Sequence, residues 1–469
     1  MSDALTVGRL APLLASLILV AGCAAGPDFA VPPAAPGERY TAGGAVPPID
    51  GAQGLRPGAA VGARWWRSFE SPALDTMVDA ALSNNPTLDS ARANLVQALQ
   101  LLAAARGAAM PQATLDASIA HGGGTEGATG TVFSVAPALS LDIDPFGAKR
   151  RRIEQAGAQA DYQRAQWQGA RLSVAGNTVL QAVALAAAGA QIAAVEDIIA
   201  VDRRNLALVR IAVDAGKSAR LDLLTADSQL AADLALLPPL QQQASVSRHA
   251  LSILTGRSPG MWTPPDFELD ALRLPAELPL VLPSALLRGR PDIAAAEAQL
   301  HAASAAIGIA AARLYPDVTL SADWRAASAS ASIGALFDHH VWNVAADLLA
   351  PLFNGRALAA QRDAASAAYA AQLGSYRQTI LTAFGEVDDT LEALRHDAAL
   401  AQAQADALAS ARQALELTQQ SFQAGQASLL ALLQAQRLYQ QARLGDARAR
   451  SQRLADSARL FIVMGGEGD

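Results

Sequence analysis

Hydrophobic and polar residues alternate with a period of two in four segments of the chain. In the first segment, Leu115 and Ala117 alternate with Asp116 and Ser118. A two-residue period that leaves one side apolar predicts a β-strand. We expect strands of about ten residues, the length of a strand that crosses a bilayer at a tilt. The four segments are 113–119, 133–143, 318–325 and 342–348.

Long stretches without helix breakers follow each pair of strand segments. Residues 149–213 and 356–424 each predict one helix, about 95–100 Å long at 1.5 Å per residue. Gly216 and Gly425 stand at the ends of these helices, where glycine adopts the left-handed conformation that stops a helix. Beyond the two glycines we expect helices at 219–257 and 427–464.

Two shorter helices precede the first strand pair. Ser71 and Pro72 fit the N-cap and first turn of a helix that runs from about residue 73 to residue 83. Pro86 starts a second helix, which we expect to end near residue 109.

Residues 172–195 carry no charge and could be mistaken for a transmembrane helix. They include Asn177, Gln181 and Gln191 and are otherwise rich in alanine, which inserts into a bilayer poorly compared with leucine. We therefore interpret this stretch as part of a tightly packed helical wall.

The chain contains an internal repeat. Pro86 and Pro291 open similar stretches, and Pro111 and Pro316 close them, in each case 205 positions apart. A repeat of this size favours a pseudo-symmetric architecture over one compact enzyme core. The predicted organisation is a signal peptide, a Pro/Gly-rich poorly packed tether, a first repeat, an irregular proline-rich connector and a second repeat, at 1–22, 23–64, 65–257, 258–283 and 284–469.

The N-terminus has the form of a bacterial lipoprotein signal. Arg9 precedes an apolar stretch, and small residues lead to Cys23, the only cysteine. We expect Cys23 to carry a covalent lipid that anchors the chain without spanning the membrane, and we expect no other cofactor. An ordinary signal peptide with an incidental cysteine is the alternative. Ala24, rather than Asp, follows the cysteine, as in lipoproteins exported to the outer membrane.

The net charge of −7 argues against binding to nucleic acid, which requires a basic face. The four predicted strands raise a different question, because four strands cannot close a barrel and open edges in lipid leave backbone groups unpaired. If the strands lie in a membrane, several chains must share one barrel, and three copies give 12 strands. A soluble sandwich with the apolar faces together is the alternative.

Three segments carry a family resemblance. The first is Cys-Ala-Ala-Gly-Pro-Asp-Phe from Cys23, and the second is Trp-Trp-Arg-Ser-Phe from Trp65. The third and most distinctive is Leu-Arg-Gly-Arg-Pro-Asp-Ile from Leu287, followed by Tyr315 and Pro316. With these segments, essentially the whole mature chain resembles the outer-membrane factor (TolC-like) family, in its NodT/OprM-like lipoprotein branch of RND efflux systems.

The resemblance implies a mainly α fold with a membrane β part and internal duplication. Three copies would form a 12-stranded β-barrel, four strands per chain, continued by a long α-helical coiled-coil tunnel in the periplasm. It implies a lipid-anchored homotrimer in the outer membrane of a Gram-negative bacterium. Its partners would be a periplasmic adaptor protein and an inner-membrane pump of the RND class. Such a channel exports small molecules passively and is not an enzyme.

The resemblance also assigns roles to residues near the two glycine turns. Gly216 and Gly425 would mark the periplasmic tips that contact the adaptor. The pore constriction would fall on Leu430, Gln434 and Arg437, which share one helix face at i, i+4 and i+7; a solvated helix face is the alternative. Gln434 stands where the family usually has an acid, so we expect a less cation-selective pore.

Asp222 matches a position that latches the closed tip in the family. Its usual aromatic and basic partners correspond here to Phe422 and Ala427, which cannot supply the polar bond, so an unlinked surface Asp is the alternative.

Two alternative functions would require other sequence patterns. A periplasmic coiled-coil adaptor or scaffold lipoprotein without a pore would need one helical hairpin flanked by small β domains, whereas here the hairpin pattern is doubled. A secreted enzyme with a helical stalk would need a catalytic constellation, and none is placed on suitable elements. His339 and His340 have no second cluster at metal-ligand spacing.

Overall fold

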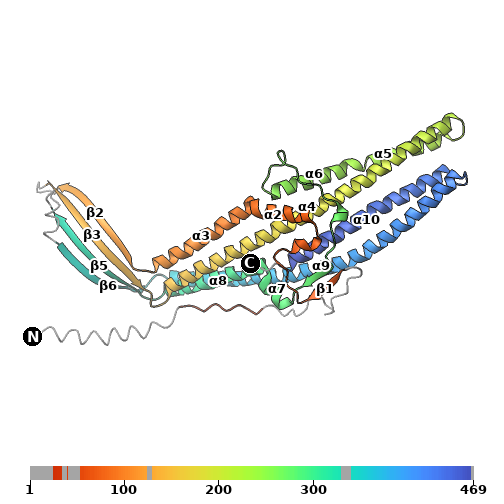
Figure 1. Ribbon diagram of the computed structural model, residues 1–469. Coiled ribbons are helices and arrows are strands. Elements are labelled where there is room, and N and C mark those ends of the chain that lie inside the picture. Colours follow the sequence, from red (N-terminus) through yellow and green to blue (C-terminus); the bar gives the residue numbers. More distant parts are fainter. Residues whose placement is uncertain (1–24, 34–39, 41–52, 124–128, 329–339, 466–469) are drawn as a thin grey trace, which may run out of the picture. The chain divides into compact units, whose positions relative to one another are not determined.

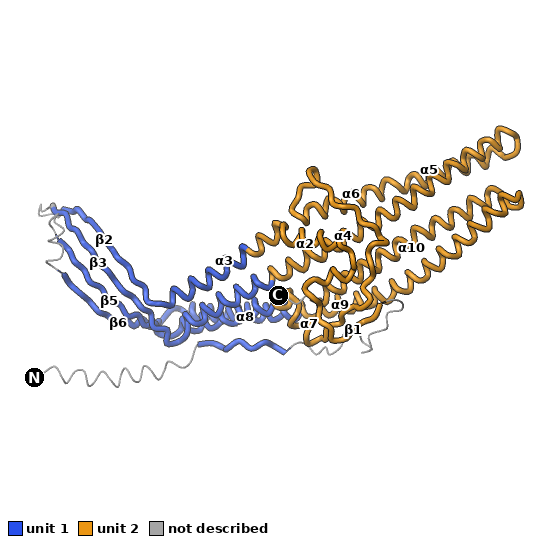
Figure 2. The backbone as a smooth tube through the Cα atoms, in the orientation of Figure 1, with its two compact units in different colours: residues 1–33, 93–165, 295–378 blue, residues 34–92, 166–294, 379–469 orange. Residues whose placement is uncertain are grey.

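A computed structural model describes residues 25–33, 40, 53–123, 129–328 and 340–465. Most of these residues are helical, and one four-stranded sheet interrupts the helices (Figure 1). The described residues belong to two compact units (Figure 2). Unit 1 comprises residues 1–33, 93–165 and 295–378, and unit 2 comprises residues 34–92, 166–294 and 379–469.

The sheet lies in unit 1 and confirms the four predicted strands. Its strands are antiparallel in the order β2-β3-β5-β6, with β2 at Gln112–Gly123, β3 at Thr129–Ile143, β5 at Asp317–Ser328 and β6 at His340–Leu349. The strands are longer than the alternating segments because they extend through weakly patterned residues toward the connecting loops. Pro137 has no amide hydrogen, and the ladder between β3 and β5 accordingly leaves out Ala136 and Pro137.

Two helices of equal length, α4 at Ala148–Asp214 and α9 at Ala357–Gln423, follow the strand pairs. Each has 67 residues, or about 100 Å at 1.5 Å per residue. Their bounds agree with the predicted helices to within a residue or two. The shorter helices α3 (Pro86–Ala108) and α8 (Pro291–Ala312) precede β2 and β5, so the order helix, strand, strand, long helix occurs twice.

The expected single helix at 219–257 is wrong. It is two helices, α5 at Arg220–Leu234 and α6 at Leu237–Leu254. Pro238 and Pro239 lie in the first turn of α6 and have no amide hydrogens to continue the bonding pattern of α5. The corresponding helix of the second half, α10 at Leu429–Val463, contains no proline and is continuous.

The core of unit 2 gathers around the aromatic residues that follow the tether. Trp65 and Phe69 lie in a short 3₁₀ helix, η1 (Trp65–Phe69), and Trp65 stacks on Phe461 of α10 at 5.2 Å between ring centroids. Helix α2 (Pro72–Asn84) follows, and the Ser71 hydroxyl accepts a hydrogen bond from the Leu74 amide as predicted for its N-cap. Helix α10 thus packs onto η1, the first helix among the described residues.

The predicted tether and connector are more ordered than expected. Strand β1 (Gly54–Pro57) pairs in parallel with strand β4 (Glu277–Leu280), beyond the short 3₁₀ helix η2 (Leu269–Ala271). Val61 is buried in the core. The description of residues 23–64 as poorly packed is therefore wrong for 54–61, because this segment and the connector provide backbone partners for each other. Helix α7 (Pro283–Gly289) leads from the connector into α8.

By length and composition alone, two helices of the described ranges could cross a bilayer, α4 and α8. In α4, 61% of the most apolar 18-residue stretch is buried inside the structure. Val179, Ala182 and Val195 in that stretch are fully buried against neighbouring elements. This burial agrees with the predicted helical wall.

Candidate functional site: sheet faces and helix-end turns

The strand register places the apolar residues of all four strands on one face. Ala117 lies opposite Val135, Leu139 opposite Ala322, and Trp324 opposite Trp342. Paired residues of neighbouring strands point to the same side of a sheet, so the predicted alternation is confirmed across the whole sheet. Much of this face is open in the single chain, with Leu115, Trp342 and Val344 about 70% exposed (69%, 70% and 70%).

The opposite face of the sheet carries polar side chains that contact one another across strands. The hydroxyls of Ser118 and Ser134 are 2.8 Å apart, and Thr319 donates to Asp142 at 3.1 Å. Asn343 donates to Asp323 at 3.4 Å. A sheet with one exposed apolar face and one hydrogen-bonded polar face can separate hydrocarbon from water.

Both outer strands of this sheet have an open edge. Among the described residues, β2 pairs only with β3 and β6 pairs only with β5. An exposed, long, apolar edge strand is a template for pairing with another strand. The sheet therefore presents two complementary edges, one at each side.

The two long helices end in matching turns. Gly216 and Gly425 have φ angles of +69° and +73°, which confirms the predicted left-handed caps. In the first turn the Gly216 amide donates to Val213 and the Lys217 amide donates to Ala212. The equivalent two bonds form in the second turn, so both ends are Schellman motifs.

Asp222 contacts its own turn. Its carboxylate accepts hydrogen bonds from the Ser218 hydroxyl at 2.6 Å and from the Ala219 amide at 3.1 Å. In the second turn the N-cap position holds Ser428, whose hydroxyl accepts from the Ala431 amide at 3.2 Å. Each turn thus carries one half of a capping box, the acid in the first and the hydroxyl in the second.

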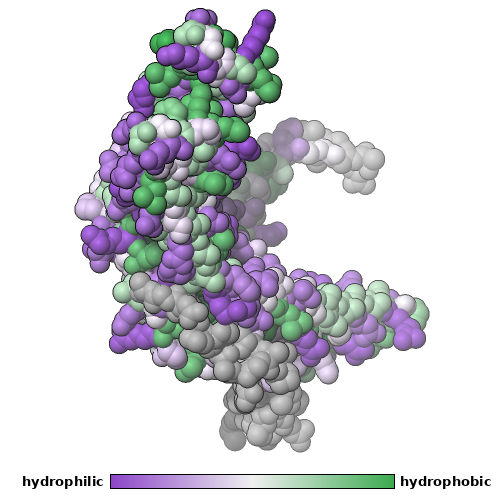
Figure 3. Space-filling model, turned by 90° about the vertical axis from the view of Figure 1, so that its right-hand side faces the viewer, coloured by the Kyte–Doolittle hydropathy of each residue, from purple (hydrophilic) through white to green (hydrophobic). Residues whose placement is uncertain are grey.

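The structure places Leu430, Gln434 and Arg437 on one exposed face of α10. The opposite face packs on α4, where the Asn205 amide donates to the Gln436 carbonyl at 2.6 Å. Apolar surface remains open among polar surface on the visible face of Figure 3. The shared helix face is therefore confirmed, whereas the pore role of the three residues stays a prediction. Cys23 lies outside the described residues.

A buried arginine explains the most distinctive sequence segment. The Arg290 guanidinium donates to Asp292 through two nitrogens, to Glu386 of α9 at 2.6 Å and to the Val463 carbonyl of α10 at 2.9 Å. Burial and its carboxylate partners act on its pKa in opposite directions, and the pKa is raised. Asp292, held by the guanidinium, has a lowered pKa. Arg290 therefore joins the start of α8, the middle of α9 and the end of α10.

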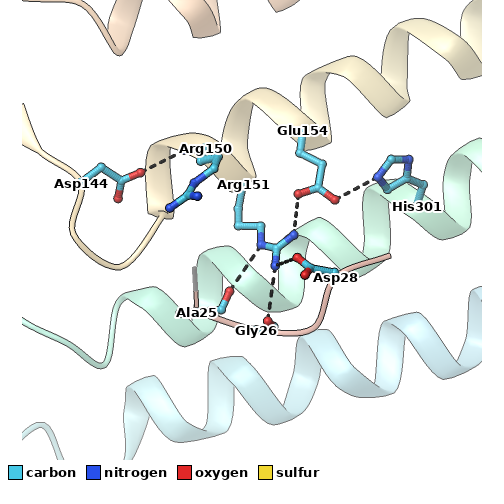
Figure 4. Close-up of polar contacts among 8 residues, drawn as sticks. All are labelled: Ala25, Gly26, Asp28, Asp144, Arg150, Arg151, Glu154 and His301. Carbon is cyan, nitrogen blue, oxygen red and sulfur yellow. Dashed lines mark hydrogen bonds and ion pairs between the residues drawn. The ribbon is translucent and has the colours of Figure 1, made fainter. Parts of the chain in front are cut away.

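A second buried arginine, Arg151, holds the N-terminal segment in unit 1 (Figure 4). Its guanidinium donates to Glu154 and to Asp28, each at 2.7 Å, and to the carbonyls of Ala25 and Gly26. His301 of α8 contacts Glu154 at 2.9 Å. No local sequence pattern predicts this cluster, because its members come from three separate segments.

Two pairs of neighbouring acidic side chains were also not predicted from the sequence. Asp202 of α4 faces Asp233 of α5, and burial together with the neighbouring carboxyl raises the pKa of Asp202 to about 7. Burial and Asp456 likewise raise the pKa of Asp397 to about 7. In each pair one carboxyl group can donate a shared proton to the other.

The chain is similar to known proteins over nearly its whole length. The sequence profile of the outer membrane efflux protein family matches residues 77–257 and 282–466. The pyoverdine export outer membrane protein OpmQ of Pseudomonas aeruginosa is 32% identical over 423 residues, which cover 86% of this chain and 87% of that protein.

Nodulation protein T of Rhizobium leguminosarum bv. viciae is 29% identical over 478 residues, covering 98% of this chain and 93% of that protein. The solved structure of the outer-membrane channel OprN matches with a TM-score of 0.83 at 27% identity, covering 95% of this chain and 99% of that one.

Proposed function

This chain belongs to the outer membrane efflux protein family, and we propose that three copies of it close one 12-stranded barrel. The protein is an outer-membrane channel of tripartite efflux systems in Gram-negative bacteria.

The open sheet carries the proposal. Its apolar face is exposed, its polar face is hydrogen-bonded, and β2 and β6 each have a free edge. In hydrocarbon every unpaired backbone group costs several kcal/mol, so the two edges must be paired. Three copies joined β6 to β2 give 12 strands, enough to leave a water-filled lumen lined by the polar face.

The long helices would continue the barrel as a tunnel. Internal duplication favours a regular tunnel, because each strand pair is followed by a helix of the same length, 67 residues. The two segments matched by the family profile begin at residues 77 and 282, which is again an offset of 205 positions. Six long helices from three copies then form a wall of quasi-equivalent parts.

The helix ends would form the periplasmic tip. We assign Gly216 and Gly425 to the turns that contact a periplasmic adaptor protein, and Leu430, Gln434 and Arg437 to the narrowest part of the pore. All three pore residues lie on a face that α4 leaves uncovered. Asp222 would act chiefly as a cap that stiffens the first turn, because both of its hydrogen bonds are local.

A lipid on Cys23 would anchor the N-terminus in the outer membrane, and the inner-membrane pump, of the RND class, would select the cargo. The channel itself would conduct passively and catalyse nothing. The relative named for pyoverdine export suggests that a small secreted organic molecule is the cargo.

A matched pair of strand variants tests the proposal. Val344→Arg places a charge on the apolar face, where it should cost about 2–4 kcal/mol in a bilayer and deplete the trimer from outer membranes. Asn343→Arg, one residue away, changes the polar face, so the trimer should form and conduct with reduced cation preference. The number of copies in each purified protein is measured by native mass spectrometry, and its ion conductance is measured in planar bilayers. A monomeric wild type, or equal tolerance of the two variants, would overturn the proposal.

A further inference from the structure

The loop between β6 and α9 exposes two large apolar side chains. Leu352 and Phe353 are 96% and 92% exposed. The same loop holds Gly355 and Arg356 at φ angles of +59° and +68°. A positive φ at arginine is a strained conformation, which persists only where the surrounding structure holds the backbone in it.

The equivalent loop of the first repeat shows what such side chains contact. After β3, Phe146 stacks on Tyr315, with the ring centroids 4.6 Å apart and the ring planes at 15°. Tyr315 lies between α8 and β5, and β5 is the strand that pairs with β3. The loop after one strand therefore packs against the junction that precedes the neighbouring antiparallel strand.

The repeat identifies the missing partner of the second loop. Met110 precedes Tyr315 by 205 positions and occupies the corresponding junction, between α3 and β2. Met110 is 64% exposed. It lies beside β2, whereas Leu352 and Phe353 lie beside β6, at the opposite edge of the sheet. Both unmatched surfaces thus stand at the two free edges.

We propose that Leu352 and Phe353 of one copy pack on Met110 of a second copy of this chain. The inference rests on the proposed function, because it requires β6 of one copy to pair with β2 of the next. Antiparallel pairing brings the end of β6 to the start of β2, as it brings the end of β3 to the start of β5. The contact replaces the Phe146–Tyr315 stack by a favourable contact between an aromatic ring and a thioether sulfur.

Disulfide trapping tests this contact. Met110→Cys is combined with Phe353→Cys, and in a second protein with Leu352→Cys, and outer membranes are oxidised. A disulfide needs Cα atoms within about 7 Å, so at least one pair should give about tenfold more covalent dimer and trimer than the control. The control is Val96→Cys with Phe353→Cys, because Val96 is exposed on α3 about 21 Å along the helix from Met110. The only native cysteine is Cys23, and each single variant is oxidised in parallel.

A second measurement removes the apolar ring without adding a thiol. Phe353→Ser should lower the temperature at which the detergent-resistant oligomer dissociates, whereas Met261→Ser should not, although Met261 is 90% exposed. Native mass spectrometry of the wild type distinguishes failure of this contact from failure of the proposed trimer. A trimer that neither crosslinks at these pairs nor loses heat resistance overturns this inference and leaves the channel proposal standing. A wild-type monomer overturns both.

Discussion

The acid pair between α4 and α5 predicts that the helical hairpin becomes less stable as the pH rises. Asp202 is 8% exposed, and one of its buried oxygens accepts no hydrogen bond from any residue that the structure describes. The other side of the pair is fixed by Gln229, whose amide donates to Asp233 at 2.8 Å. Two carboxyl groups in contact need one proton between them, and replacing Asp202 by Asn supplies a permanent donor instead.

The size of the effect follows from the pKa of Asp202, which is about 7 in the folded chain and about 3.9 in the unfolded chain. Between these values the folded chain holds a proton that the unfolded chain has lost, so raising the pH lowers the free energy of unfolding. The full shift corresponds to about 4 kcal/mol. Because Asp233 is partly exposed, we expect solvent to screen this to about 2 kcal/mol.

The assay is urea unfolding, followed by the helical circular-dichroism signal, of wild type and Asp202→Asn in detergent at pH 3.5 and pH 8. The variant should match wild type within about 0.5 kcal/mol at pH 3.5, where the unfolded chain still holds most of the proton, and exceed it by about 2 kcal/mol at pH 8. Asp227→Asn, an exposed change on α5, the helix that carries Asp233, should not alter the difference between the two pH values. A variant that is equally destabilised at both pH values would refute the shared proton.

Three further outcomes are expected. Arg290→Lys keeps the charge but cannot bridge both carboxylates with a planar fork, so the free energy of unfolding should fall by about 1–3 kcal/mol; an unchanged urea midpoint would contradict this role. Gly256→Ala puts a Cβ 2.2 Å from the Asn84 carbonyl oxygen at a φ of +70° and should lower stability by about 2–4 kcal/mol, whereas Gly260→Ala meets nothing within 4 Å and should be neutral. Arg437→Ala should shift the reversal potential toward cation selectivity in single-channel recordings, and an unchanged potential would remove this residue from the constriction.

Elements with a local cause could be predicted from the sequence. The strands follow from a two-residue alternation, and the same alternation gave the correct face for every paired strand. Gly216 and Gly425 ended the long helices because a left-handed cap needs no distant partner. The break before α6 was equally local, since Pro238 and Pro239 are adjacent, and reading the stretch 219–257 as one helix overlooked them.

Features that depend on distant partners were not predictable from one sequence. Gly54 pairs with Glu277, and nothing in a short polar strand indicates which segment lies beside it. Arg290 stood in the most distinctive segment, yet its partners Glu386 and Val463 are far along the chain. The acid pairs likewise unite residues of separate helices, so their raised pKa values have no trace in the local pattern.

The equal length of α4 and α9 restricts how this protein can vary. Deleting one residue from a helix shortens it by about 1.5 Å and rotates everything beyond by about 100°. If α4 and α9 together form the tunnel wall, a deletion in only one of them would move its end turn away from the height of the other turn. The same deletion would rotate the buried face of that helix toward solvent. Relatives with a longer or shorter channel should therefore carry matched insertions or deletions in both helices. These should come in steps near seven or eleven residues, which return the same helix face to the core.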